Sequence, residues 1–142
     1  MAVTDFEYAL LSAYSHVFAR ENKGNLPDLG AMGFTQIAEL NLRGNGVDSD
    51  GFEGVVVRRG NDIVIAIAGT DQYQDYAQDV FTALGHGEQV VSATQLYVRA
   101  LLAVDNLIRT SEPDLKPSIS FTGHSLGGGL ASVMGMAFDQ PA

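Results

Sequence analysis

The chain has 142 residues, of which 46% are hydrophobic and 18% charged, a composition typical of one soluble globular domain over residues 1–142. Its net charge of −9 argues against a nucleic-acid partner or an acidic membrane surface, because both attract basic faces. The absence of cysteine excludes disulfides, a thiol nucleophile and thiolate metal sites. We expect neither a signal peptide nor a transmembrane segment, and the sequence leaves the localisation unknown.

The N-terminal third predicts one helix followed by loops and one ambiguous segment. Thr4 and Glu7 match a capping box, and apolar residues then recur at helical spacing up to about Arg20. Residues 34–42 alternate weakly between apolar and polar, so this segment is either a strand or a short helix. The loop at 43–51 holds acidic residues whose spacing does not match a calcium-binding loop, and we expect no metal there.

Two apolar strands joined by a tight turn form the centre of the predicted fold. Residues 52–58 and 62–68 are typical of strands, and Arg-Gly-Asn at 59–61 predicts the hairpin turn between them. The second strand is apolar almost throughout, which indicates burial on both faces beneath helices. It ends at Gly69, so the amide of Thr70 is expected at the carboxyl edge of the sheet, where a ligand crevice forms.

A polar segment and a long helix follow the hairpin. Residues 71–87 either form an ordinary connector or flank a substrate cleft, and the sequence leaves both alternatives open. Residues 88–110 predict a helix with a buried face marked by Val90, Tyr97, Leu101, Val104 and Ile108. A strand–helix–strand order with such apolar strands implies an α/β fold with a largely parallel sheet between helices.

The strongest functional signal lies at residues 118–138. An apolar strand turns through Gly-His-Ser-Leu-Gly at 123–127 into an apolar helix, which is the layout of a nucleophile elbow. Gly123 and Gly127 would avoid the collisions that side chains make on so tight a turn. The turn would hold the Ser125 hydroxyl clear of the backbone, with the positive end of the helix behind it. The alternative is a glycine-rich turn that merely allows close packing.

A serine hydrolase needs a nucleophile, a base, an orienting acid and two oxyanion amides. Ser125 fits the nucleophile, and the amide of the next residue, Leu126, fits one oxyanion donor. The amide of Thr70, expected at the same sheet edge, fits the second donor. We expect His16 and His86 to be ordinary surface residues, because neither has an evident partner nearby in the sequence.

Three segments resemble the lipase class 3 family of α/β-hydrolases. They are the strand ending in Gly-Thr at 65–70, the Asp-Tyr-Ala-Gln-Asp run at 75–79 and the turn at 122–129. The resemblance covers roughly residues 50–142. It implies a partial α/β-hydrolase fold, with a mostly parallel sheet flanked by helices and with the C-terminal strands of the family missing. Ala68 and Tyr76 depart from it, since the family usually has arginine and tryptophan at these positions.

The resemblance also implies an activity and a set of roles. The family hydrolyses carboxylic esters of lipids, usually acylglycerols, and uses no cofactor. Carried over by position, Ser125 is the nucleophile, and Thr70 and Leu126 supply the oxyanion amides. Asp79 is then a structural acid that ties the oxyanion loop to its neighbour, and the segment after Thr70 falls where the family has its lid. The expected partner is a lipid or small ester substrate.

The triad of this fold runs Ser, Asp, His along the chain. The 17 residues after Ser125 hold one acid, Asp139, and no histidine, and the His124 side chain is expected to point away from the Ser125 hydroxyl. We therefore expect the isolated chain to be inactive. It is part of a longer hydrolase, or a partner chain supplies the rest, or it is a non-catalytic remnant that binds lipid, acyl groups or another protein. An incomplete sheet would expose a strand edge that favours self-association.

Overall fold

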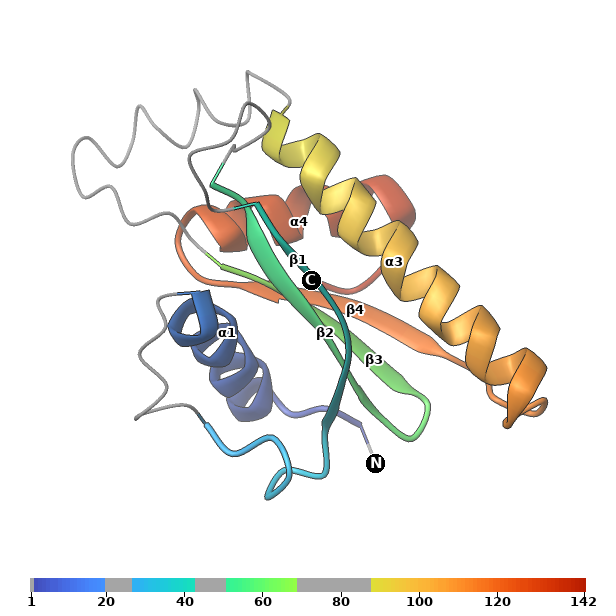
Figure 1. Cartoon of the computed structure of the whole chain (residues 1–142). Coiled ribbons are helices and arrows are strands. Elements are labelled where there is room, and N and C mark those ends of the chain that lie inside the picture. The colour runs from blue at the N-terminus through green and yellow to red at the C-terminus, as the bar shows by residue number, and fades with distance from the viewer. Residues whose placement is uncertain (1, 20–26, 43–50, 69–87) are drawn as a thin grey trace.

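A computed structural model describes residues 2–19, 27–42, 51–68 and 88–142, except for the side chains of 16–19 and 88. These residues form one sheet with helices on both faces (Figure 1). Helix α1 (Asp5–Ala19) packs on one face of the sheet, and helices α3 (Glu88–Thr110) and α4 (Leu126–Phe138) pack on the other. The three helices and the turn before α4 lie where the sequence predicts them.

The described sheet has four strands in the order β1-β2-β3-β4. They are β1 (Thr35–Asn41), β2 (Glu53–Arg59), β3 (Asp62–Ile67) and β4 (Ser118–Gly123). The ambiguous segment at 34–42 is thus a strand, with a register shift between Gln36 and Ala38 where it pairs with β2.

The sheet is mixed, which differs from the mostly parallel sheet that we expected. Strands β1 and β2 are antiparallel, as are β2 and β3, and within the described residues only β3 and β4 are parallel. The loop of Gly60 and Asn61 is too short for any connection but an antiparallel hairpin, and Gly60 supplies its positive φ of 58°. The segment containing α3 is long enough to carry the chain back for a parallel strand.

Strand β3 is buried on both faces, as its apolar sequence predicts. Ile63, Ile65 and Ile67 face α3 and α4, while Val64 and Ala66 face α1. The core between the sheet and the two C-terminal helices also contains Phe52, Val56, Leu96, Phe121, Leu126, Leu130 and Met134. The smaller core beneath α1 is built on Leu11, Phe34, Val55 and Val57.

One predicted core position on α3 is wrong. Leu101 is 41% exposed, whereas its neighbour Ala100 is fully buried. Ala93 and Ala100 lie in the contact with the sheet, so small side chains let the helix backbone approach β1 and β2 closely. The prediction followed the larger apolar residues and therefore took Leu101 in place of Ala100, while its other four positions lie in or against the core.

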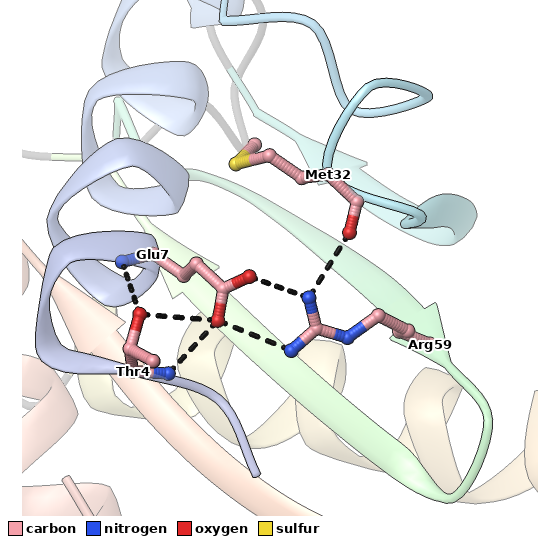
Figure 2. Close-up of polar contacts among 4 residues, drawn as sticks. All are labelled: Thr4, Glu7, Met32 and Arg59. Carbon is pink, nitrogen blue, oxygen red and sulfur yellow. Dashed lines mark hydrogen bonds and ion pairs between the residues drawn. The ribbon is translucent and has the colours of Figure 1, made fainter. Parts of the chain in front are cut away.

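Arg59, the last residue of β2, connects three parts of the chain (Figure 2). Its guanidinium donates two hydrogen bonds to the carboxylate of Glu7 and one of 3.0 Å to the carbonyl of Met32. It also lies 4.4 Å from the ring centroid of Phe34. The predicted capping box forms in the same place, since the Glu7 amide donates to Thr4 Oγ1 and the Thr4 amide donates to the Glu7 carboxylate.

The residues that follow α4 return to the outer edge of β4 and form a backbone hydrogen bond with it. The amide of Phe121 donates a hydrogen bond of 2.8 Å to the carbonyl of Pro141. A Cβ on Gly135 would lie 2.7 Å from Cβ of Ala142, so these last residues also pack tightly against α4. The β4 edge is therefore covered at its centre. None of the described helices is long and apolar enough to span a membrane.

Candidate active site

Ser125 lies between β4 and α4 in a backbone conformation that L residues rarely adopt. Its φ is 58° and its ψ is −124°, outside the left-handed helical region that asparagine and aspartate visit. A serine that caps a helix has extended dihedral angles and accepts a hydrogen bond from the first turn, but Ser125 makes no such bond. Such strain costs on the order of 1–3 kcal/mol and is concentrated at functional sites. Helix capping therefore does not explain this serine.

Two glycines make the turn around Ser125 possible. A Cβ on Gly123 would lie 2.3 Å from the carbonyl carbon of Gly127, and a Cβ on Gly127 would lie 2.2 Å from the carbonyl oxygen of Ile67. Both distances are far inside van der Waals contact. The turn thus folds back on β4 and rests on the end of β3, which confirms the predicted reason for both glycines.

The amide of Leu126, the first of the two predicted oxyanion donors, lies at the start of α4. Leu126 is the first residue of α4, and the first amides of a helix have no partner within the helix. Its side chain is buried in the core, which anchors this end of the helix. The helix dipole adds positive potential at the same point. The second predicted donor, Thr70, lies outside the described residues, as do Asp79 and His86.

The described residues do not bring a base or an orienting acid to Ser125. Its hydroxyl makes no hydrogen bond to any side chain in the described ranges. Asp139 caps the other end of α4, about 20 Å along the helix axis from Ser125. The His124 side chain is exposed. No cluster of three or more metal-ligating side chains occurs in the part of the chain that the structure describes.

The strand ends beside the turn lie at one edge of the sheet. Ile67 of β3 is paired with Gly123 of β4, so the parallel strands end together, as expected for a ligand crevice at this edge. Glu53, the first residue of the antiparallel strand β2, lies at the same edge and is only 4% exposed. In the sequence, Glu53 stands out only as a single acidic residue between Phe52 and Gly54 in an apolar strand, and it is not among the residues that we predicted for the site.

Two comparisons with known proteins gave matches to phospholipases. The model of a phospholipase-like family, described as the Tle-like phospholipase domain, matches residues 7–142. The extracellular phospholipase A1 of Serratia liquefaciens is 26% identical to the chain over 138 residues. The match covers 92% of the chain but 38% of that relative, so the chain spans well under half of the relative's length. No solved structure gave a match.

Proposed function

Because the chain belongs to the phospholipase-like family described as the Tle-like phospholipase domain, we propose that it hydrolyses carboxylic esters of lipids through an acyl-enzyme on Ser125. The observation that carries the proposal is the strained backbone of Ser125, which neither capping nor sequence preference accounts for. The name of the Serratia relative supports a glycerophospholipid as the substrate. The resemblance to class 3 lipases supports acylglycerols, and both substrates share the ester of a fatty acyl chain.

The reaction begins with attack of Ser125 Oγ on the acyl carbonyl carbon. The carbonyl electrons move to oxygen, and the resulting oxyanion accepts hydrogen bonds from the amide of Leu126 and, as second donor, that of Thr70. Collapse of the tetrahedral adduct breaks the ester bond and releases the lipid alcohol, which takes the serine proton by way of the base. Water then attacks the acyl-enzyme, releases the fatty acid and restores the hydroxyl.

The base and the orienting acid are proposed to come from outside the described residues. They are supplied by further sequence of a longer chain or by a partner subunit, and the coverage of the Serratia relative supports the first source. Without them, none of the described residues accepts the serine proton, and the reaction is slow. The 142-residue chain alone is therefore proposed to have little activity.

The test is covalent labelling with a fluorophosphonate, which mimics the tetrahedral adduct and modifies an activated serine. We expect labelling of the chain joined to the sequence that follows it in its parent gene to map to Ser125 by peptide mass spectrometry and to disappear in Ser125→Ala, whereas the 142-residue chain alone is labelled slowly. Ser132→Ala is the matched control, because Ser132 is exposed on the same helix and donates a hydrogen bond to the carbonyl of Gly128. Hydrolysis of a glycerophospholipid labelled on one acyl chain then identifies the substrate. Equal labelling of Ser125→Ala and the parent chain would rule out this nucleophile.

A second candidate function is a non-catalytic module that binds acyl chains or another protein. The observation in its favour is that the Ser125 hydroxyl has no hydrogen-bond partner among the described side chains. This function predicts that a fluorescent fatty acid binds to the chain while no fluorophosphonate labelling occurs, either for the chain alone or when it is joined to the sequence that follows it in its parent gene.

A further inference from the structure

Two polar side chains of β4 lie on the sheet face that α1 covers. Ser120 is buried and Thr122 is partly buried. Their partners in the parallel pairing with β3 are Val64 and Ala66, which belong to the apolar core beneath α1. Apolar side chains on β4 would continue this core, whereas a hydroxyl in such a place is unfavourable unless it makes a hydrogen bond. The two hydroxyls therefore need a specific explanation.

Both hydroxyls form hydrogen bonds with the same residue of α1. The phenolic hydroxyl of Tyr8 donates a bond of 2.9 Å to Ser120 Oγ, and the Thr122 hydroxyl donates a bond of 3.2 Å to the backbone carbonyl of Tyr8. Residues two apart on a strand point to the same face and lie about 7 Å apart. Tyr8 thus spans the end of β4, with its carbonyl at one hydroxyl and its phenol at the other. The two bonds need the hydroxyls of Tyr8 and Thr122, which phenylalanine and valine lack.

The end of β4 is in turn in contact with the start of α4. Thr122 is followed directly by Gly123, and a Cβ on Gly123 would lie 2.3 Å from the carbonyl carbon of Gly127. Backbone atoms in such close contact cannot rotate away, so a displacement of Thr122 is transmitted through Gly123 to the first turn of α4. The last residues of β4 are therefore held on one face by Tyr8 and on the other by α4.

The conformation of Ser125 makes this restraint important. Its φ of 58° and ψ of −124° are rarely adopted by L residues, and such a conformation persists only where the surrounding structure over-determines it. Apolar packing is non-directional, whereas a hydrogen bond weakens steeply when its angle changes. Two hydrogen bonds to one residue of α1 therefore fix the position and rotation of the β4 end more closely than an apolar contact would.

We propose that Tyr8 and Thr122 are positioning residues for Ser125. Tyr8 holds the two hydroxyl side chains of β4, and Thr122 thereby fixes the point at which the chain enters the turn at Gly123. This point sets where the turn presents the Ser125 hydroxyl. The effect on reactivity rests on the proposed function, whereas the mechanical coupling between α1 and the turn does not.

The variant Thr122→Val removes the hydroxyl and keeps the branched shape of the side chain. In the chain joined to the sequence that follows it in its parent gene, we expect the limiting rate constant of Ser125 labelling by a fluorophosphonate to fall about tenfold, because small displacements of a reacting group are costly. The half-saturating reagent concentration should stay unchanged. Thr122→Ser keeps the hydroxyl and should label at the rate of the parent protein. An unchanged rate constant in the valine variant, or an equal fall in the serine variant, would overturn the proposal.

Tyr8→Phe tests the other hydrogen bond and has a matched control on the same helix. The hydroxyl of Tyr14 donates a bond of 3.0 Å to Gln36 Oε1 of β1, at the opposite edge of the described sheet from β4. Tyr8→Phe and Tyr14→Phe thus each remove one hydrogen bond between α1 and the sheet, and both should lower the melting temperature. Only Tyr8→Phe should slow the labelling of Ser125, by about tenfold. If both variants slow it equally, or neither does, Tyr8 has a structural role only.

Amide hydrogen exchange tests the coupling without reference to reactivity. The Gly127 amide donates a bond of 3.0 Å to the carbonyl of His124 within the turn, and the Leu42 amide donates one of 2.9 Å to the carbonyl of Phe52, far from it. We expect the Gly127 amide to exchange about tenfold faster in Thr122→Val, with no change at Leu42. Uniform acceleration, or none at Gly127, would show that Thr122 does not act on the turn. If the parent protein is not labelled at all, the proposed function fails, and the exchange measurement still decides the coupling.

Discussion

Gly123 and Gly127 lie so close that a Cβ on the first would be 2.3 Å from both the carbonyl carbon and the carbonyl oxygen of the second. The last residue of β4 and the first turn of α4 therefore touch through their backbones. This contact forces the chain to reverse within a few residues, and Ser125 is at the point of reversal. The unusual dihedral angles of Ser125 are a consequence of this contact.

The first prediction is that Gly123→Ala strongly destabilises the fold. The added methyl would overlap backbone atoms, which cannot rotate away, so we expect a loss of about 3 kcal/mol in the free energy of unfolding. Gly60→Ala is the control, because Gly60 has φ of 58° and open space around it. That variant should lose about 1 kcal/mol in the free energy of unfolding, because alanine is strained at a positive φ. Urea unfolding of both variants measures the difference, and equal losses would contradict the close backbone contact at the turn.

The second prediction separates the strain at Ser125 from its chemistry. Ser125→Gly removes the penalty of a positive φ, and after subtraction of the entropy of glycine we expect a gain of about 1 kcal/mol. Ser125→Ala keeps the strain, so its stability should match that of the parent chain. Thermal unfolding should place the glycine variant about 3 °C above both. A glycine variant that is no more stable than the alanine variant would show that the turn is not strained.

Much of the fold can be predicted from local sequence patterns. The hairpin follows from Gly60 between two apolar runs, and α3 follows from helical periodicity over 88–110. The burial of Ala100 in place of Leu101 could not be read from hydrophobicity, because it depends on how closely the helix approaches the sheet. The direction of β1 likewise depends on which strand it pairs with, a long-range choice that periodicity does not encode.

The candidate site was likewise predictable from the sequence only in part. Ser125 could be predicted because its motif and its flanking elements are contiguous in sequence. Glu53 could not, because a single acid in a strand is usually solvated, and its proximity to the turn arises from pairing between β2 and β3. The hydrogen bonds from Arg59 to Glu7 join residues that are 52 positions apart, so the sequence predicted only the capping interaction of Glu7 with Thr4.

The third prediction is that the stability contributed by the Glu7–Arg59 ion pair is lost at low pH. Hydrogen bonds from Arg59 lower the pKa of Glu7 from 4.5 to about 2 in the folded chain. Because the folded pKa lies below the unfolded value, the pair stabilises the fold above pH 4.5, and this contribution is lost as the pH falls from 4.5 towards about 2. We expect the difference in urea midpoint between the parent chain and Glu7→Gln to shrink across that range.

Arg59→Lys is the companion variant for this measurement. Lysine keeps the charge but cannot make the two-pronged contact with the Glu7 carboxylate, so the pKa of Glu7 should rise towards its ordinary value. The acid-dependent loss of stability then shifts to higher pH. If the difference between the parent chain and Glu7→Gln is the same at every pH, the ion pair does not contribute to folding stability.

The fourth prediction is that Gly135 keeps the β4 edge covered. Alanine at a helical glycine usually stabilises by about 1 kcal/mol, but a Cβ on Gly135 would lie 2.7 Å from Cβ of Ala142 and 2.8 Å from the carbonyl oxygen of Gln140. Gly135→Leu should therefore displace these last residues and break the bond from the Phe121 amide to Pro141. An uncovered strand edge pairs readily with another chain, so sedimentation should show concentration-dependent association. Met136→Leu, at a position that is 78% exposed, is the control and should sediment like the parent chain. A Gly135→Leu variant whose sedimentation matches that control would mean that Pro141 does not protect this edge.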